Sequence, residues 1–545
     1  MTTETTNPSG PRGDLEWGTT PRLVRSSAER FPTRQAIVDV DASVTLTFPQ
    51  LAAAVHEAAR AFMTTGIEPG DRVAIWAPNC WEWIVAALGL QSAGAVLVPL
   101  NTRFKGREAA YILGKSGARA LVTVTGFLDT DYVALLRGSV DVAAELPALD
   151  TIVVLRGDAP EGTVSWPEFL RRADATSSDD AESRALAVRP TDLADLLFTS
   201  GTTGNPKGVM QTHAATLRSF RDWSEVVGLR EGDHYLVVNP FFHAFGYKAG
   251  FLAALMMGAT VFPHAVFDAQ AVLERIPRDR ISMLPGPPTL YQTILNHPDR
   301  DKYDLSSLRL AVTGAAVIPV ELVVRMRKEL AFETIITGYG LTESCGIATM
   351  CRYDDDPETI ATTSGRAIPG VEVLVVDAQG KELPRGEPGE VVVRGYNVMQ
   401  GYYDDPSETA ATVDADGWLH TGDVGVMDDR GYLRITDRTK DMFIVGGFNA
   451  YPAEIENLLL RNEDIAQVAV VGVPDERMGE VGMAFVVLRP GSTVTEQDVV
   501  AWARSEMANY KAPRHVVFVD ELPLNATGKV LKYELRDRAA RLLSS

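Results

Sequence analysis

The sequence predicts a multidomain α/β protein in which a large amino-terminal domain is hinged to a smaller α+β domain. First, short apolar runs alternate with longer amphipathic runs from Arg72 onward, which is typical of βαβ units. Second, closely spaced strand pairs with turns between them begin near Val371 and indicate a small antiparallel unit. Third, a shorter mixed pattern begins near Met442. A chain of 545 residues is long enough for several such units.

The alternating region predicts sheets that are mostly parallel and are covered by helices on both faces. The apolar stretch 83–100 reads as a buried helix over 81–92 and a strand over 95–99, because Gln91, Ser92 and Gly94 interrupt it, and we expect no transmembrane segment. Further strands are expected at 72–76, 121–124, 195–198, 235–238, 260–262, 282–284, 308–312 and 334–337, and a further helix at 246–257.

The rest of the chain completes the division into domains. The antiparallel unit is expected to hold strands at 371–376 and 390–393 and a hairpin over 425–435. The last region is expected to hold helices at 452–461 and 496–506 and strands at 466–473, 484–488 and 516–519. The resulting division is a disordered tail over 1–24, an amino-terminal domain over 25–436, a hinge over 437–441 and a mobile carboxy-terminal domain over 442–545.

Charge and cysteine content exclude several classes of function. The formal net charge of −20 argues against nucleic-acid binding and against attraction to an anionic membrane, so an anionic ligand needs local lysines or arginines. Three scattered cysteines form neither a disulfide framework nor a zinc pattern, which favours a reducing, cytoplasmic location.

A loop rich in glycine and hydroxyl groups follows the strand expected at 195–198. Glycines allow close approach of the backbone, successive N–H groups suit phosphate oxygens, and a lysine adds positive charge. The spacing differs from the P-loop of kinases and GTPases. We expect the loop to join a buried strand to a helix, and a flexible linker is the alternative. The candidate phosphate ligands are Thr199, Ser200, Gly201, Thr202, Thr203, Gly204 and Lys207.

This loop resembles the phosphate-binding signature of the adenylate-forming enzymes, which include acyl-CoA synthetases, adenylation domains of peptide synthetases and luciferases. The resemblance extends over about residues 25 to 540. It implies ATP and Mg²⁺ as cofactors, coenzyme A as a co-substrate, and Thr199 as a catalytic residue that also contacts the metal.

The motif from Thr337 to Glu343 follows a strand end, where α/β sheets place their ligands. In the family the aromatic residue of this motif stacks on adenine, the threonine contacts the α-phosphate and the glutamate holds Mg²⁺. The alternative is a helix start capped by Thr342. Nucleotide-binding residues are therefore expected at Gly338, Tyr339, Gly340, Thr342 and Glu343, with Glu343 also catalytic. The resemblance adds Gly314, Ala315 and Ala316, and assigns Gly314 and Gly338 to the acyl substrate as well.

The carboxy-terminal third carries four more motifs of the family. Asp423 and Arg438 would bind the ribose, although an Asp-Gly turn alone can be structural. Lys440 stands at the family's hinge position. Lys529 would be the catalytic lysine that reaches the acyl carboxylate and the α-phosphate, the alternative being a solvated surface lysine. The loop with Gly446, Gly447 and Phe448 would line the pantetheine tunnel.

The segment 239–248 would gate the acyl pocket. His243 is the expected gate and a catalytic candidate, although a core histidine is the alternative. Amino-acid-activating relatives carry an aspartate here, and its absence favours a simple carboxylic acid. Because a buried lysine needs a partner, we expect Lys248, Tyr247 or both to contact a polar group of the substrate.

The pocket-region residues are similar to one actinobacterial group of CoA ligases, which act on the propanoate side chain left on the C/D rings during steroid breakdown. The expected function is an acid–CoA ligase that forms an acyl-AMP and then a thioester. Alternatives are a medium-chain or aromatic acid as substrate, a carrier protein as acceptor, and an inactive nucleotide-binding or scaffold protein. The partners are small molecules, and a homodimer is left open.

Overall fold

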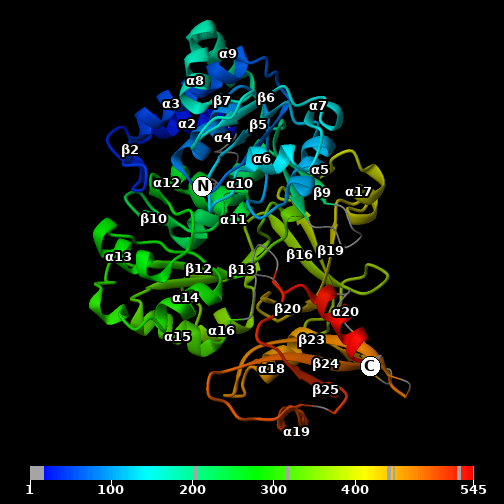
Figure 1. The fold of residues 1–545 in the computed structure, drawn as a ribbon. Helices are drawn as coiled ribbons and strands as arrows, with labels where there is room; N and C mark the ends of the chain where they lie inside the picture. Colours follow the sequence, from blue (N-terminus) through cyan, green and yellow to red (C-terminus); the bar gives the residue numbers. More distant parts are fainter. Residues whose placement is uncertain are drawn as a thin grey trace, which may run out of the picture. The chain divides into compact units, whose positions relative to one another are not determined.

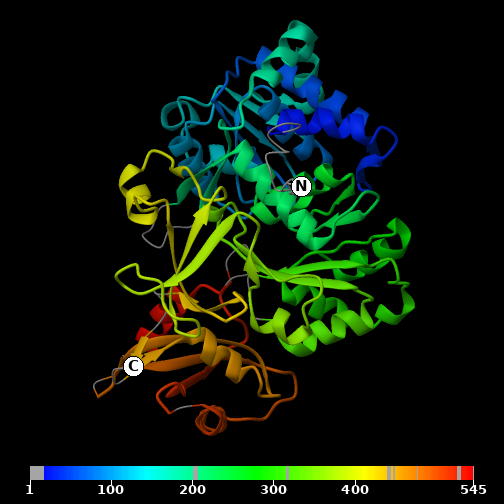
Figure 2. The ribbon, with the colours of Figure 1, turned by 180° about the vertical axis from the view of Figure 1, so that it is seen from behind.

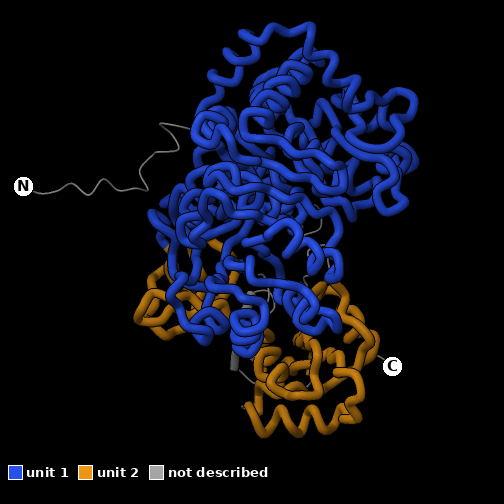
Figure 3. Tube along the Cα trace, turned by 90° about the vertical axis from the view of Figure 1, so that its left-hand side faces the viewer, with its two compact units in different colours: residues 1–314, 318–372, 393–419 blue, residues 315–317, 373–392, 420–545 orange. Residues whose placement is uncertain are grey.

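A computed structural model describes residues 18–199, 206–314, 318–438, 443–445, 448–475, 477–507, 509–524 and 530–543. The chain packs into two compact units, coloured separately in Figure 3. Unit 1 contains residues 1–314, 318–372 and 393–419, and unit 2 contains residues 315–317, 373–392 and 420–545. The predicted disordered tail over 1–24 is wrong from Thr20 onward, because helix α2 (Thr20–Arg30) begins there and Leu23 and Val24 are buried. Residues 1–17 lie outside the described residues. The hinge at 437–441 stays a prediction, and residues 439–441 lie outside the described residues.

An eight-stranded sheet in unit 1 has the order β18-β9-β8-β4-β3-β5-β6-β7 (Figure 1). The strands from β8 to β7 pair in parallel, as expected for βαβ units, whereas β9 pairs antiparallel with both β8 and β18. The bounds are β3 (Arg72–Trp76), β4 (Val96–Pro99), β5 (Ala120–Thr123), β6 (Thr151–Val154), β7 (Val164–Ser165), β8 (Leu193–Thr199), β9 (Lys207–Thr212) and β18 (Gly401–Tyr402).

The helices around this sheet follow from local sequence signals. Helix α4 is buried from Glu82 to Ser92, which confirms the predicted buried helix. Helix α3 begins at a capping box in which Thr47 and Gln50 satisfy each other's backbone N–H groups. The bounds are α2 (Thr20–Arg30), α3 (Phe48–Thr64), α4 (Trp81–Ser92), α5 (Gly106–Ser116), α6 (Tyr132–Arg137), α7 (Val142–Glu145), α8 (Trp166–Arg171), η1 (Arg172–Ala175) and α9 (Ser178–Ala187).

Two four-stranded sheets follow in unit 1, with orders β10-β11-β1-β2 and β12-β13-β14-β15. They join through Met283, which bridges Tyr235 and Leu310, so the strand expected at 282–284 is a single bridging residue. The bounds are β1 (Gln35–Asp39), β2 (Val44–Thr47), β10 (His234–Val237), β11 (Thr260–Pro263), β12 (Leu310–Gly314), β13 (Thr334–Tyr339), β14 (Thr349–Met350) and β15 (Arg366–Ala367).

The helix expected at 246–257 is present but begins as α11 and a π-helical turn, η2, before becoming α12. In Figure 1 the helices α13 to α16 lie around β12 and β13. The bounds are α10 (His213–Val227), α11 (Ala244–Gly246), η2 (Tyr247–Leu252), α12 (Ala253–Met257), α13 (Ala269–Asp279), α14 (Pro288–Leu295), η3 (Arg300–Lys302), α15 (Val320–Glu329), η4 (Thr342–Ser344), α16 (Pro357–Thr362) and α17 (Pro406–Thr412).

Unit 2 holds most of the sheet β16-β17-β19-β20 and all of a five-stranded sheet in which β25 joins β22-β21-β24-β23 (Figure 2). Helices α18 and α20 pack on β23, and α19 packs near β25, over a core that includes Val470 and Phe485. The bounds are β16 (Val371–Val376), β17 (Gly389–Gly395), β19 (Leu419–Met427), β20 (Leu433–Arg438), β21 (Phe443–Val445), β22 (Phe448–Ala450), α18 (Pro452–Leu459), β23 (Ile465–Asp475), β24 (Gly479–Leu488), α19 (Glu496–Glu506), β25 (His515–Phe518) and α20 (Lys532–Leu543).

Among the residues that the structure describes, no helix is both long enough and apolar enough to cross a bilayer.

Gly365 and Gly228 have nearly the same φ, 76° and 77°, in different surroundings. A Cβ on Gly365 would lie 1.8 Å from the backbone carbon of Met350, whereas one on Gly228 would meet nothing within 4 Å. We expect Gly228→Ala to lower the free energy of unfolding by about 1–2 kcal/mol through left-handed strain alone. Gly365→Ala should cost about 1–3 kcal/mol more through overpacking. Denaturant unfolding of both variants tests this, and equal losses would contradict it.

Candidate active site

The predicted phosphate loop lies at the end of a β-hairpin. Thr199 is the last residue of β8 and Lys207 the first of β9, and the two are paired across the antiparallel ladder. The expectation that a helix follows the loop directly is wrong, because residues 207–212 form a strand paired on both edges and α10 begins only at His213. The expected ligands Ser200, Gly201, Thr202, Thr203 and Gly204 lie outside the described residues.

The second motif lies at the carboxyl ends of β12 and β13. Gly314 and Gly338 are paired in this parallel ladder, so the two predicted pocket glycines lie side by side. A Cβ on Gly340 would lie 2.4 Å from the backbone of Ile347, so this turn requires glycine. Ala315 and Ala316 lie outside the described residues.

After Tyr339, the last residue of β13, the chain enters η4, which carries Thr342 and Glu343. Leu341 occupies the N-cap position and Thr342 is the first residue of the turn, so the alternative with Thr342 as a helix cap is wrong. The described backbone therefore places Thr342 and Glu343 directly beyond the strand end, as the motif predicts.

A chain of side-chain contacts joins the two motifs. The Tyr402 hydroxyl donates a hydrogen bond to Oε1 of Glu343 over 2.9 Å. The Lys207 ammonium lies 5.3 Å from the centroid of the Tyr402 ring and forms an ion pair with Glu408 of α17. Burial and the Glu343 carboxylate raise the pKa of Tyr402 above its usual value, so the hydroxyl keeps its proton. Glu343 and Lys207 are thus linked through one neutral aromatic side chain.

Backbone hydrogen bonds fix the segment that carries Tyr402. The Met399 N–H donates to the carbonyl of Glu343 over 2.8 Å, and the Tyr403 N–H donates to the carbonyl of Gly208 over 2.7 Å. Between them, Tyr402 is paired with Val209 in β9. Sequence reasoning missed Tyr402 and Glu408, because a tyrosine after glycine and an acid in the first turn of a helix are ordinary features of surface segments.

A buried ion pair lies behind the acyl-side segment. Nζ of Lys248, in η2, lies 3.0 Å from Oδ1 of Asp195, in the middle of β8, and neither side chain is more than 1% exposed. The same ammonium lies 3.6 Å from Sγ of Cys345. Burial by itself lowers the pKa of Lys248, but the Asp195 carboxylate and the Cys345 thiol together raise that pKa above its usual value.

The ion pair with Asp195 removes the reason for expecting Lys248 to contact the substrate. Lys248 has its partner inside the protein, so its burial no longer calls for a ligand group. Tyr247 is also fully buried, and its hydroxyl accepts a hydrogen bond from Nε2 of Gln91 over 2.9 Å. A substrate role for Lys248 or Tyr247 stays a prediction, and the burial of these side chains no longer supports it.

His243 caps α11 through Nδ1, which accepts the Phe245 N–H over 3.2 Å, and the residue is exposed to solvent. The alternative of a core histidine is therefore wrong, while the gate role stays a prediction. Asn79 holds the preceding segment by accepting the Phe241 N–H and donating to the carbonyls of Val237 and Asn239.

The predicted ribose residues lie in unit 2. Asp423 of β19 and Arg438 of β20 are paired across an antiparallel ladder, so the fold brings the two backbone positions together. Phe448 begins β22 and pairs with Val445. Lys440, Gly446, Gly447 and Lys529 lie outside the described residues.

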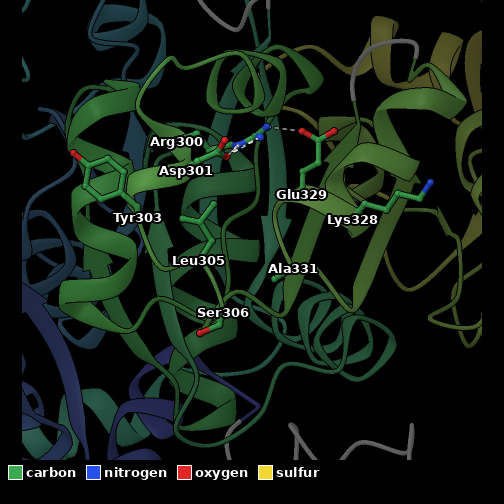
Figure 4. A pocket seen from close by; sticks show the side chains of 8 residues that line it. All are labelled: Arg300, Asp301, Tyr303, Leu305, Ser306, Lys328, Glu329 and Ala331. Atoms are coloured by element: carbon green, nitrogen blue, oxygen red, sulfur yellow. Dashed lines mark hydrogen bonds and ion pairs between the residues drawn. The ribbon is translucent and has the colours of Figure 1, made fainter.

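A pocket of about 330 Å³ lies elsewhere in unit 1, at η3 and the end of α15. Figure 4 shows Arg300 joined to both Asp301 and Glu329 across it. None of the predicted site residues lines this pocket, so it has no part in the candidate site.

Comparison with known proteins decides the family. The protein-family model for AMP-binding enzymes matches residues 24–403, and the family model for their carboxy-terminal domain matches residues 454–529. The chain belongs to the AMP-binding enzyme family. Within this family, the 3-[(3aS,4S,7aS)-7a-methyl-1,5-dioxo-octahydro-1H-inden-4-yl]propanoyl:CoA ligase of Rhodococcus jostii is 52% identical over 95% of this chain and 98% of its own length. The ligase of the same name from Mycobacterium tuberculosis is 51% identical over 95% and 97%.

Solved structures of the family agree. The anthranilate CoA ligase AuaEII in complex with anthranoyl-AMP matches with a TM-score of 0.86 at 28% identity, over 97% of this chain and 98% of that chain. ATP-bound MatB from Rhodopseudomonas palustris matches with a TM-score of 0.82 at 29% identity, over 95% and 99%. The predicted multidomain α/β fold is confirmed, and so is the predicted class of enzyme, an AMP-forming acid–CoA ligase that uses ATP and CoA.

The buried ion pair generates a stability prediction. Asp195→Ala should destabilise unit 1 by about 3–5 kcal/mol, because it leaves the Lys248 ammonium buried without a counter-ion. Asp195→Ala combined with Lys248→Met should lose clearly less, since no buried charge remains. Thermal and denaturant unfolding of both variants and of Lys248→Met alone tests this. A double variant as unstable as the sum of the single variants would show that the two charges do not interact.

Proposed function

We propose that this AMP-binding enzyme activates the propanoate side chain of a partly degraded steroid ring system and joins it to coenzyme A. The observation that carries the proposal is the 52% identity, over nearly the full length of both chains, to a ligase whose name specifies an indane-ring propanoyl group. The 51% identical enzyme from Mycobacterium tuberculosis carries the same name. Both span 95% of this chain, so the resemblance includes the segments expected to form the acyl pocket.

The reaction first joins two anions, the carboxylate of the acid and a phosphate of ATP, and the sulfur of CoA reacts afterwards. A carboxylate oxygen of the acid attacks the α-phosphorus of ATP, and the bond from that phosphorus to pyrophosphate breaks. The CoA sulfur then attacks the acyl carbonyl, and AMP leaves with the electron pair of the broken carbon–oxygen bond. The first step needs positive charge near the phosphates, because negative charge shifts among their oxygens in the transition state.

Lys207 and Lys529 are the cations that we propose for this step. Lys207 starts β9 next to Thr199, at the base of the loop expected to hold the phosphates. Lys529 is proposed from its motif and stands at the last residue matched by the carboxy-terminal family model.

Glu343 and Thr199 are the residues that we propose to hold Mg²⁺. In the described part of the chain no three His, Cys, Asp or Glu side chains come together as a metal-binding group. A single carboxylate fits an ion that takes its other oxygens from nucleotide phosphates and water. When bound, the ion would neutralise charge on those phosphates. Tyr402 holds one oxygen of Glu343, which restricts the direction of the carboxylate.

A medium-chain acid is the second candidate substrate. The human medium-chain acyl-CoA ligase ACSF2, a mitochondrial enzyme, is 32% identical over 96% of this chain and 88% of its own length. The lower identity favours the steroid-derived acid. The expected cytoplasmic location and homodimer stay predictions.

A panel of carboxylic acids tests the substrate. With ATP and CoA, we expect kcat/KM for the indane-ring propanoate to exceed that for octanoate and benzoate by at least about tenfold, which corresponds to about 1.4 kcal/mol of differential transition-state binding. Release of AMP and formation of the thioester are measured together, since AMP release without thioester would indicate another acceptor. A preference for octanoate would support the medium-chain alternative.

A second prediction separates the two half-reactions. Lys529→Ala should slow formation of the acyl-AMP by about 10²-fold or more, the scale for losing one donor to transition-state charge. The same variant should still convert a synthetic acyl-AMP and CoA to the thioester at close to the normal rate. Lys532→Ala is the control, because Lys532 is a nearby lysine that pairs with Glu456. Equal losses in both half-reactions would contradict a role for Lys529 in adenylation alone.

A further inference from the structure

In this structure the carboxylate of Glu408 forms an ion pair with the ammonium of Lys207. Glu408 lies in the first turn of α17, where Oδ1 of Asp405 accepts its backbone N–H over 3.1 Å and so anchors the start of the helix. The Lys207 side chain is 17% exposed and that of Glu408 is 39% exposed. The pair therefore stands at the surface of unit 1, where a ligand from solvent can reach it.

The contacts around Lys207 leave two directions for its ammonium. One is toward Glu408, its present partner, and the other is toward the loop expected to bind phosphates, whose flanking residue Thr199 is paired with Lys207 across the ladder. The face of the Tyr402 ring, whose centroid lies 5.3 Å from the ammonium, attracts the cation whichever anion pairs with it. A carboxylate and a phosphate oxygen are both anionic acceptors, and they compete for the same cation.

The partly exposed ion pair between Lys207 and Glu408 is weak enough for another anion to replace the carboxylate. Such pairs contribute little to stability, because solvent screens them and two long side chains must be held still. A triphosphate carries more negative charge than one carboxylate, so it competes effectively for the ammonium. The lysine can therefore pass from Glu408 to the nucleotide with a modest loss in ATP affinity.

We propose that Glu408 is a stand-in for phosphate: it pairs with Lys207 while the nucleotide is absent and releases the lysine when ATP binds. This inference rests on the proposed function, in which Lys207 binds the phosphates of ATP. Glu408 would then be a positioning residue that weakens nucleotide binding and helps pyrophosphate and AMP to leave. It also keeps the ammonium beside Tyr402 between turnovers, so that the cation is already near the loop.

Glu408→Gln tests the proposal, since glutamine keeps the shape of the side chain and removes its charge. We expect the dissociation constant of Mg²⁺–ATP, measured by calorimetry without acid, to fall about two- to fivefold, the scale of a surface ion pair. The KM for ATP should fall in parallel, the KM for the acid should stay the same, and kcat should fall or stay level as product release slows. Glu408→Ala should change ATP affinity in the same direction.

Glu231→Gln is the matched control. Glu231 also pairs with a basic side chain, Arg34, at the surface of unit 1, and its replacement changes the net charge by the same amount. Its ATP affinity should equal that of the wild type. A gain as large as that of Glu408→Gln would mean that net charge alone is responsible, and would overturn the proposal.

Two further outcomes separate this proposal from the proposed function. If Lys207→Gln weakens ATP binding but Glu408→Gln leaves it unchanged or weaker, Lys207 binds phosphate and the stand-in role of Glu408 is wrong. If Lys207→Gln leaves ATP affinity unchanged, the phosphate role of Lys207 fails first, and the stand-in role fails with it.

Discussion

The antiparallel pairing of β9 with both β8 and β18 is the constraint on which the described part of the candidate site depends. Its pairing with β8 places Lys207 opposite Thr199, at the base of the expected phosphate loop. Its pairing with β18 places Tyr402 beside Val209, and from there the phenol reaches Glu343. A one-residue slip of β9 would turn every side chain to the opposite face of the sheet and would separate these groups. Many backbone hydrogen bonds, rather than any single side chain, therefore set the distance between the loop lysine and the proposed metal ligand.

Strand β8 links this arrangement to the acyl side. Asp195 in its middle binds Lys248 of the π-helical turn, and Thr199 ends the same strand four residues later, about 13 Å away at the usual rise of a strand. The Lys248 ammonium also contacts Cys345, two residues beyond Glu343. One buried cation thus touches the strand that leads to the phosphate loop and the turn that carries Glu343. Because buried ion pairs often stabilise less than an apolar replacement would, we interpret this pair as a device for register and position.

Sequence patterns predicted those parts of the site that are local. The loop after β8, the motif after β13 and the buried helix α4 are each encoded by consecutive residues, so their type and place could be inferred. The pairings that complete the site join residues far apart in the chain: Tyr402 meets Glu343 across 59 positions and Lys207 meets Glu408 across 201. Such contacts follow from tertiary packing, and no local signal marks them. The sequence did not reveal β9 as a strand, because Pro206 and Gly208 resemble a continuing loop. This segment is a strand because it pairs with β8 and β18. Lys248 was correctly expected to need a partner, but the partner lies on a strand whose side-chain directions the sequence alone does not reveal.

Electrostatics explains why the cations near the site are already paired. The chain carries a net charge of −20, so its long-range field repels ATP, and binding must rely on short-range contacts. An unpaired lysine next to Glu343 would attract that carboxylate and draw it away from the Mg²⁺ ion that we propose it holds. Tyr402 prevents this by standing between them as a neutral group, with its hydroxyl on the acid and its ring under the ammonium. Glu408 therefore holds Lys207 near the loop as a weak partner, while the hydrogen bond from Tyr402 restricts the carboxylate of Glu343. An acidic protein can in this way hold a lysine and a carboxylate near each other while a neutral phenol keeps these two groups from pairing.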